Sequence, residues 1–306
     1  MGCQHIEIFS ELGFRNLVVY DENKETVIKV KKRFPHVKKL EKLNLSNQEF
    51  DGVIISTPPN THQKIVRLCL KNNLPFLLEK PLGESSKGWK EIIRDLKKKE
   101  IPSFIGYPRR FGEGYLKLKK ICDSGNIGKI IFIHSTFSQD FSRYRPDYKN
   151  TYYVNHKTGG GIIFDALSHH MDYFVFLFGP IKKITSLKEK NIILDTQVED
   201  FAILDISFRN NDVEGLIIGN QFQKPNTDLI EIIGTKGSLK YDRIKNILYK
   251  SLNDEWKEEK INGDWKEILK KQALSFIDLI NKKKTIGTSL AEGLNIVESI
   301  ESRKSL

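Results

Sequence analysis

Two short segments of the sequence carry side chains that could share one active site. Lys80 ends an apolar run in the tripeptide Glu79-Lys80-Pro81, and Asp165 precedes His169 by four residues in a stretch that opens with three glycines. Side chains four apart lie on one face of a helix, so we expect Asp165 to hydrogen-bond one ring nitrogen of His169 and leave the other free for proton transfer. A lysine beside this pair would complete a cluster suited to handling a hydroxyl proton.

Each half of this pattern also has an ordinary explanation. An aspartate and a histidine four residues apart on a helix are often a solvated pair, and a lysine before a proline can simply end a strand. Lys80, however, follows the apolar residues 75–78, which have the pattern of a buried strand. A charge at that place is costly unless it has a function, so Lys80 is a candidate functional residue on physical grounds.

In the first part of the chain, short apolar runs alternate with charged helical stretches. The expected strands lie at residues 17–21, 50–57, 75–79 and 103–106. Strands that alternate with helices at this spacing indicate βαβ units and a parallel sheet. We therefore predict a Rossmann-type α/β domain over residues 1–106, which binds its ligand beyond the carboxyl ends of its strands.

Beyond residue 107 the strands follow one another. After an expected helix at 114–123, a strand at 129–136 and a second helix at 165–178, strand-like runs lie at 181–186, 200–208, 213–220, 228–234 and 238–242. This succession predicts a C-terminal α/β domain over 107–306 with a largely antiparallel, open sheet and helices on one face. The loop at 139–161 is long, aromatic and basic, which is uncommon in a loop without a function.

Composition narrows the class of protein. No run of the 306 residues approaches the roughly 18 to 20 apolar residues that cross a bilayer, so we expect a soluble, cytoplasmic protein. Three scattered cysteines predict neither a disulfide framework nor a metal site. The net charge of +11 comes from dispersed lysine clusters, which argues against nucleic-acid binding and favours modest steering of an anionic cofactor or substrate.

Several polar side chains follow the expected parallel strands. Asp21 ends the first of them, nineteen residues after Gly2, close to the spacing at which an acid reaches the adenosine ribose of a dinucleotide. An aspartate at a strand end also suits a turn, and both interpretations stay open. If Asp21 contacts the ribose, its charge would repel a 2′-phosphate and favour NAD over NADP. Ser56, Thr57 and Pro58 follow the next strand.

Taken in order, these motifs resemble the oxidoreductase family typified by glucose-fructose oxidoreductase, inositol dehydrogenase and MocA. The resemblance rests on Met1-Gly2 with His5, the turn at 57–62, Glu79-Lys80-Pro81, the segment 107–114 with Arg110, the glycines at 159–161, Asp165, His169, Asp172, and the segment 231–237. It implies an N-terminal domain that holds NAD or NADP, and a C-terminal domain whose open sheet forms the substrate wall and often joins copies of the chain into a homo-oligomer.

The resemblance and the chemistry together suggest a role for each residue. His169 would be the acid/base, Asp165 its orienting partner, and Lys80 the cation that polarises the substrate oxygen or relays its proton. Asp172 either contacts substrate or is an ordinary acid of the helix. The residues expected to contact the cofactor are Gly2, Asp21, Ser56, Thr57, Pro58, Asn60, His62, Glu79 and Lys80. Those expected to contact a sugar, cyclitol or nucleotide sugar are Arg110, Arg143, Arg145, Tyr152, Tyr153, Asp165 and His169, although a solvated loop would explain the arginines and tyrosines equally well.

Three classes of function remain. The first is an NAD(P)-dependent oxidoreductase that acts on a hydroxyl or keto carbon; the second is a catalytically silent relative that binds cofactor or sugar, which the intact Lys80, Asp165 and His169 argue against; the third is a basic nucleic-acid binder. The match starts at the last glycine of a Gly-x-Gly-x-x-Gly loop, without the strand before it. We therefore expect the functional protein to begin roughly ten residues upstream.

Overall fold

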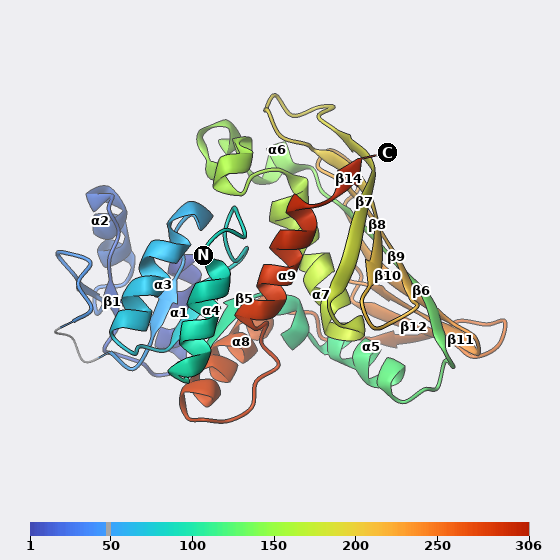
Figure 1. The fold of residues 1–306 in the computed structure, drawn as a ribbon, viewed down its shortest axis with the longest axis horizontal. Helices are drawn as coiled ribbons and strands as arrows, with labels where there is room; N and C mark the ends of the chain where they lie inside the picture. The colour runs from blue at the N-terminus through green and yellow to red at the C-terminus, as the bar shows by residue number, and fades with distance from the viewer. Residues whose placement is uncertain (47–49, 306) are drawn as a thin grey trace.

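The computed structural model describes residues 1–46 and 50–305, in two regions that lie side by side (Figure 1). The elements of the first region are α1 (Gly2–Glu11), β1 (Val18–Val19), α2 (Lys24–Arg33), β2 (Lys38–Lys39), β3 (Val53–Ile55), a 3-10 turn (Pro59–Thr61), α3 (His62–Lys71), β4 (Phe76–Glu79), α4 (Trp89–Lys98) and β5 (Ser103–Gly106). Their alternation confirms the expected βαβ pattern.

The strands of this region are all parallel, as predicted. β1 pairs with β2, and β3, β4 and β5 form a second sheet in that order. Among the described residues β1 and β3 do not pair with each other, so the parallel strands form two sheets. In a doubly wound sheet of the order 3-2-1-4-5-6, the strand that comes first in the chain lies in the middle. The break between the two sheets, which separates β1 from β3, falls at that middle position.

The second region is built on one large sheet. Its elements are a 3-10 turn (Pro108–Phe111), α5 (Glu113–Asp123), β6 (Ile130–Ser138), α6 (Phe141–Tyr144), three 3-10 turns (Tyr148–Asn150, Tyr152–Val154 and His156–Thr158), a π-helical turn (Ile163–Leu167), α7 (Ser168–Phe178), β7 (Ile181–Lys190), β8 (Phe201–Phe208), β9 (Glu214–Asn220), β10 (Thr227–Gly234), β11 (Gly237–Asp242), β12 (Ile247–Ser251), β13 (Lys257–Lys260), α8 (Trp265–Ile280), α9 (Leu290–Glu301) and β14 (Lys304–Ser305).

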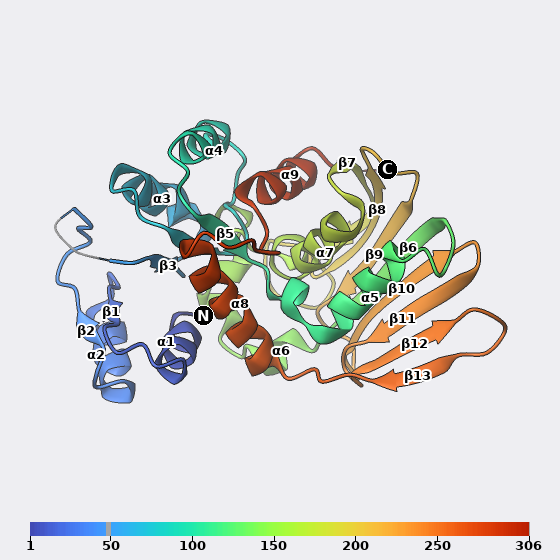
Figure 2. The same ribbon diagram turned by 90° about the horizontal axis from the view of Figure 1, so that it is seen from below.

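The nine strands of the described sheet run in the order β13-β12-β11-β10-β6-β9-β8-β7-β14. All neighbours are antiparallel except β6 with β9 and β7 with β14, which confirms a largely antiparallel sheet. Helices α5, α7 and α9 lie on one side of it (Figure 2). Alternate residues of β8, such as Ala202, Leu204 and Ile206, are buried while Ile203 and Asp205 between them are partly exposed, because successive side chains of a strand point to opposite faces.

Helix α8 returns to the first region, although the predicted boundary at residue 106 assigns it to the second. It packs against α1 and β5, where Phe276 joins Phe9 and Phe104 in one hydrophobic cluster (Figure 2). Thr288 then forms a β-bridge with Ile105. The two regions are therefore tied together by the end of the chain. In the described ranges, no helix combines the length and apolar character needed to cross a membrane.

Candidate active site

Lys80 and Asp165 meet where the two regions face each other. Strand β4 is buried over its whole length and ends at Glu79, which places Lys80 at the carboxyl edge of the parallel sheet. Its Nζ donates hydrogen bonds to the backbone oxygen of Asp165 at 2.7 Å and to its Oδ1 at 2.9 Å. The two side chains retain 16% and 15% of their exposure, so the pair is accessible to a ligand but largely withdrawn from solvent.

Asp165 does not orient His169, and that part of the predicted pairing is wrong. Oδ1 of Asp165 instead accepts hydrogen bonds from Lys80 and, at 2.7 Å, from the hydroxyl of Tyr152. The physical reason is tertiary: the ammonium of Lys80 and the hydroxyl of Tyr152, which come from other elements, both donate to Oδ1 of Asp165. Asp165 also lies in the π-helical turn Ile163–Leu167 and α7 begins only at Ser168, so Asp165 and His169 do not belong to one regular α-helix.

The charge of Asp165 is stabilised by its partners. Burial would raise the pKa of its carboxyl, but the charge and hydrogen bond of Lys80, with the hydrogen bond from Tyr152, outweigh burial and hold the pKa below its usual value. For Tyr152, burial and then the neighbouring carboxylate raise the pKa of the phenol. At neutral pH Asp165 is therefore a carboxylate that accepts hydrogen bonds from Lys80 and from the neutral phenol of Tyr152.

His169 lies beside this cluster as a neutral imidazole. Burial, followed by the positive charges of Lys80 and Arg109, lowers its pKa well below the ordinary value. Its ring stands edge-on to Tyr107, with 5.4 Å between the ring centres. The buried Nδ1 has no hydrogen-bond partner among the described residues. A neutral ring at this place can accept or donate a hydrogen bond without carrying a charge of its own.

The start of α1 and the carboxyl ends of β3 and β4 come together beside Lys80. A Cβ on Gly2 would lie 3.0 Å from Oγ of Ser56, so the glycine lets α1 begin close to this side chain. Nε2 of His5 lies 2.6 Å from Oε1 of Glu79, and both side chains are buried. This pair joins α1 to the end of β4. The described residues provide no side-chain cap for α1, so its first N–H groups are available to an anion such as a cofactor phosphate.

Of the other expected cofactor residues, Thr57, Pro58 and Asn60 are exposed at the turn after β3. Asp21 is also exposed, and its Oδ1 accepts a hydrogen bond from the backbone N–H of Asn23 at 2.8 Å. This is the turn interaction that the sequence analysis gave as the alternative to a ribose contact. An exposed carboxylate that uses one oxygen in a turn keeps the other for a ribose.

His62 is fully buried and cannot touch a cofactor, contrary to expectation. Its Nδ1 lies 3.1 Å from the backbone oxygens of Pro81 and Leu82, and its Nε2 lies 2.9 Å from that of Thr57. Burial lowers the pKa of the ring, whereas the hydrogen bonds to these backbone oxygens raise it by less. His62 therefore holds the turn after β3 against the segment after Lys80.

Two expected substrate residues are structural. Arg110 is 2% exposed, and its guanidinium donates to both carboxylate oxygens of Asp172, at 3.0 and 2.7 Å, and to Glu292 at 2.9 Å. Tyr153 is 1% exposed and its ring packs on Phe141 at 4.2 Å between centres. The expectation of substrate contact is wrong for both. Asp172 accepts the hydrogen bonds of Arg110 and holds its guanidinium in place. The sequence carries no local signal for this, because Glu292 is distant along the chain.

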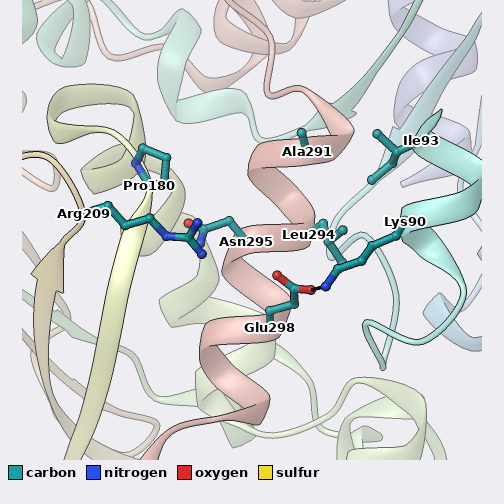
Figure 3. A pocket seen from close by; sticks show the side chains of 8 residues that line it. All are labelled: Lys90, Ile93, Pro180, Arg209, Ala291, Leu294, Asn295 and Glu298. Carbon is teal, nitrogen blue, oxygen red and sulfur yellow. Dashed lines mark ion pairs between the residues drawn. The ribbon is translucent and has the colours of Figure 1, made fainter. Parts of the chain in front are cut away.

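The remaining expected residues stay available. Arg143 and Arg145 are exposed on the loop above the site, and the charge of Arg145 contributes to lowering the pKa of Asp165. A cavity of about 300 Å³ between α4, α9 and the start of β7 lies apart from these residues (Figure 3). Arg209, Asn295 and Glu298 line it, but no candidate site residue does. The candidate site residues are therefore centred on Lys80 and Asp165 and not on this cavity.

Doubly wound parallel sheets bind nucleotides beyond the carboxyl ends of their strands, and Lys80 lies at that edge. A family model described as "Oxidoreductase family, NAD-binding Rossmann fold" matches residues 2–107, and one described as "GFO/IDH/MocA C-terminal domain" matches residues 115–240. The protein belongs to the Gfo/Idh/MocA family of oxidoreductases.

Relatives are similar over part of their length. The "Inositol 2-dehydrogenase 2" of Mycolicibacterium vanbaalenii is 26% identical over 221 residues, which are 69% of this chain and 60% of the relative. The "Myo-inositol 2-dehydrogenase" of Thermotoga maritima is 25% identical over 208 residues, which are 66% of this chain and 59% of the relative. The matches thus span about 60% of these curated relatives.

Solved structures share the fold over nearly the whole chain. A levoglucosan dehydrogenase in complex with NADH and levoglucosan has a TM-score of 0.86 at 19% identity, over 98% of this chain and 94% of that one. An oxidoreductase from Agrobacterium radiobacter in complex with NAD+, L-tartaric acid and magnesium has a TM-score of 0.79 at 19% identity, over 94% and 87%. At this identity the likeness establishes the architecture.

Proposed function

We propose that the protein is an NAD(P)-dependent oxidoreductase that transfers a hydride between nicotinamide and a hydroxyl or keto carbon of a sugar, cyclitol or nucleotide sugar. The observation that carries this proposal is the contact of Lys80 with Asp165 at the carboxyl edge of the parallel sheet. When bound, the nicotinamide accepts or supplies the hydride. The chain's own residues must then bind the substrate oxygen and move its proton.

The proton is handled by the cluster around Lys80. The ammonium of Lys80 donates two hydrogen bonds to Asp165, and its third N–H can be donated to a substrate oxygen. His169 stays neutral because burial and the nearby cations depress its pKa. It would bind the same hydroxyl and take up or return its proton, while Lys80 stabilises the developing negative charge on oxygen.

The cofactor would be held by residues around the start of α1 and the turn after β3. Gly2 allows the close approach of α1 to Ser56, and the first N–H groups of α1 suit a diphosphate. Thr57, Pro58 and Asn60 line the exposed turn beside it, and Asp21 would contact the adenosine ribose. We propose NAD as the preferred cofactor, because the carboxylate of Asp21 would repel the 2′-phosphate of NADP.

The substrate would enter from the loop that carries Arg143, Arg145 and Tyr152. The hydroxyl of Tyr152 already donates to Asp165, so its ring edge borders the reacting position. The relatives named above act on inositol and levoglucosan, which supports a polyhydroxylated substrate. The exposed arginines would add affinity for a carboxylate or phosphate on it.

We also propose that copies of the chain associate through the open face of the large sheet. Partly exposed apolar side chains gather there on neighbouring strands, namely Phe132, Leu216, Ile218, Leu229 and Ile233. Such a face is suited to cover by a second copy. A cytoplasmic location, without nucleic-acid or membrane partners, completes the proposal and agrees with the three free cysteines.

The test is a dehydrogenase screen. Purified protein is incubated with NAD+ or NADP+ and a panel of cyclitols, neutral sugars, uronic acids and nucleotide sugars, and nicotinamide reduction is followed at 340 nm, a general optical signature of NADH and NADPH. Reduction with at least one polyol, abolished in a Lys80→Ala, His169→Ala double variant, supports the proposal. Cofactor binding without turnover of any substrate, in either direction, would identify the chain as a catalytically silent relative.

A further inference from the structure

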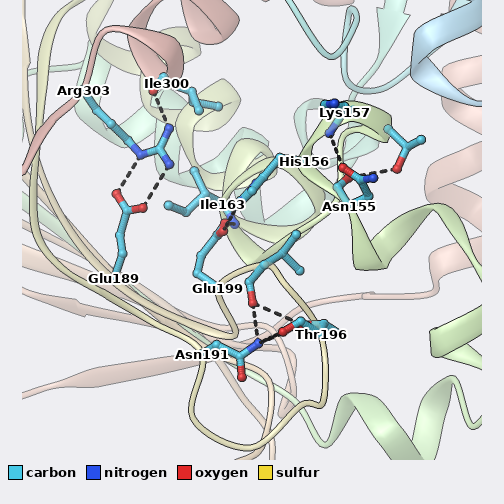
Figure 4. A network of polar contacts seen from close by, with 12 residues as sticks. Asn155, His156, Lys157, Ile163, Glu189, Asn191, Thr196, Glu199, Ile300 and Arg303 are labelled. Atoms are coloured by element: carbon cyan, nitrogen blue, oxygen red, sulfur yellow. Dashed lines mark hydrogen bonds and ion pairs between the residues drawn. The ribbon is translucent and has the colours of Figure 1, made fainter.

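The π-helical turn that carries Asp165 is held in place by one residue from another part of the chain. Glu199 precedes β8, and its backbone oxygen accepts a hydrogen bond from the N–H of Ile162 at 3.0 Å. Its side-chain Oε1 accepts a second from the N–H of Ile163, also at 3.0 Å (Figure 4). These donors open the turn Ile163–Leu167, so Glu199 fixes where the turn begins.

Gly161, which precedes this turn, leaves space for the carboxylate of Glu199. Gly161 has a φ of +89°, and a Cβ there would lie 2.5 Å from Oε1 of Glu199. Only glycine adopts this backbone conformation and leaves that space without strain. The N–H of Asp165 in turn donates to the backbone oxygen of Gly161 at 3.0 Å. A short chain of contacts therefore connects Glu199 to the residue that binds Lys80.

Glu199 is also an unusual carboxylate for its surroundings. It is 6% exposed, and its Oε2 has no hydrogen-bond partner among the described residues. The nearest cation-forming group is His156, whose Nε2 lies 3.3 Å from Oε2. Burial is the main reason that the pKa of Glu199 is raised to about 7. The carboxyl therefore changes charge near neutral pH, next to a histidine whose own pKa is lowered, chiefly by burial.

Other charged groups face this pair from the neighbouring elements. Arg303, beyond α9, binds Glu189 of β7 through two hydrogen bonds of 2.7 and 2.9 Å (Figure 4). The charge of Arg303 lowers the pKa of Glu199, and that of Glu189 raises it. The adjoining Asp200 accepts hydrogen bonds from the backbone N–H groups of residues 192–194 through its carboxylate. Arg303 and Glu189 bind each other, and His156 is the group that lies next to the free Oε2 of Glu199.

We propose that Glu199, with His156 beside it, is a positioning residue of the active site that presents Asp165 to Lys80 and that makes turnover depend on the charge of the Glu199 carboxylate. The ionised carboxylate accepts the N–H of Ile163 more strongly than the protonated form does. Loss of the charge loosens the turn, and Asp165 then holds Lys80 less well. Turnover therefore decreases as the pH falls through the range in which Glu199 takes up its proton.

The experiment compares three variants with the parent protein and with one control. Glu199→Gln keeps an acceptor for Ile163 but cannot titrate, Glu199→Ala removes the acceptor, and His156→Gln removes the neighbouring titratable group. The control is Glu113→Gln, the same chemical change in an exposed ion pair with Lys117. Two measurements are made on each protein between pH 5.5 and 8.5: hydrogen–deuterium exchange of residues 160–168 by mass spectrometry, and kcat with a substrate from the dehydrogenase screen.

In the parent protein and the control, we expect exchange of residues 160–168 to rise and kcat to fall together as the pH is lowered through about 7, after correction for intrinsic exchange. Glu199→Gln removes this step from both profiles, and His156→Gln displaces it. Glu199→Ala exchanges at least about tenfold faster at every pH, since the loss of one hydrogen bond to a charged group has that magnitude. Unchanged exchange in Glu199→Ala overturns the proposal, and so do superimposable kcat profiles of the parent and Glu199→Gln.

The inference rests on the proposed oxidoreductase function only for the second measurement. If no substrate is turned over, the proposed function fails, while exchange alone still decides whether Glu199 holds the turn. If exchange responds as expected but the kcat profiles of the parent and Glu199→Gln coincide, Glu199 is structural only and its assignment as a positioning residue is wrong.

Discussion

Lys80 donates hydrogen bonds to both the backbone oxygen and the carboxylate of Asp165, at 2.7 and 2.9 Å, although 85 residues separate them in the chain. One residue comes from the carboxyl end of β4 and the other from the π-helical turn before α7. The contact therefore spans the two regions of the fold. It fixes the side chain of Lys80 where the parallel-sheet region meets the region of the large sheet, and the first prediction concerns this lysine.

Replacing Lys80 by alanine is expected to lower kcat by about 10² to 10⁴, the usual contribution of a group that stabilises or transfers a proton. The reason is the loss of the only cation that contacts Asp165 in the described structure. Steady-state kinetics checks this, with Lys90→Ala as control, because Lys90 is an exposed lysine in an ion pair with Glu298. A turnover within about threefold of the parent would remove Lys80 from its proposed role.

Replacing Tyr152 by phenylalanine tests the second donor to Asp165. We expect kcat to fall about tenfold, since one hydrogen bond to a charged acceptor at 2.7 Å is lost while the ring remains. KM should change less than kcat if the hydroxyl acts through Asp165. Tyr144→Phe is the matched control, because Tyr144 is exposed and its hydroxyl binds only Asn226 among the described residues. Equal effects of the two substitutions would contradict the prediction.

Replacing Arg110 by alanine should reduce stability and not substrate affinity. The change leaves Asp172 charged and buried without its bidentate partner, which typically costs about 3 to 5 kcal/mol of unfolding free energy. Urea unfolding measures this loss, and the exposed Arg143→Ala should stay within about 0.5 kcal/mol of the parent. If Arg110→Ala folds with parental stability and shows only a raised KM, the original expectation of substrate contact is restored.

The sequence predicted the parallel and antiparallel regions because their strands have simple patterns of alternation or burial. It also singled out Lys80, because a charge after a buried strand needs an explanation, and Asp165, because it precedes His169 by four residues. It could not predict that Lys80 and Tyr152 would both bind the carboxylate of Asp165, because helical spacing says nothing about partners from other elements. The contacts of Arg110 with Glu292 and of Ile163 with Glu199 depend on tertiary packing, which leaves no periodic signal.

His169 is expected to show its depressed pKa in the stability of the protein. Folding keeps the ring neutral below its unfolded pKa of about 6.5, so it contributes stability above that pH and loses it as the pH falls toward the folded value. His169→Asn should therefore lose less stability than the parent between pH 7 and 5. His170→Asn should behave in the same way, because burial lowers the pKa of His170 to about 3.

The two histidines should differ in catalysis. His170 is fully buried and has no described hydrogen-bond partner, whereas His169 keeps part of its exposure beside Lys80. Only His169→Asn should lower kcat, again by about 10² to 10⁴. A comparable loss in His170→Asn, at a temperature where both variants are folded, would show that the effect arises from packing of α7 and not from proton transfer.

The last prediction concerns the choice of cofactor. Asp21 stands exposed after β1, and one of its carboxylate oxygens is engaged by the N–H of Asn23. The remaining charge would repel the 2′-phosphate of NADP, so we expect a higher kcat/KM with NAD than with NADP. Asp21→Asn keeps the turn acceptor and removes the charge; it should therefore raise kcat/KM for NADP while leaving stability unchanged. Glu22→Gln, one residue further on and also exposed, is the control. Equal use of both cofactors by the parent, or an equal gain in the two variants, would show that Asp21 serves only the turn.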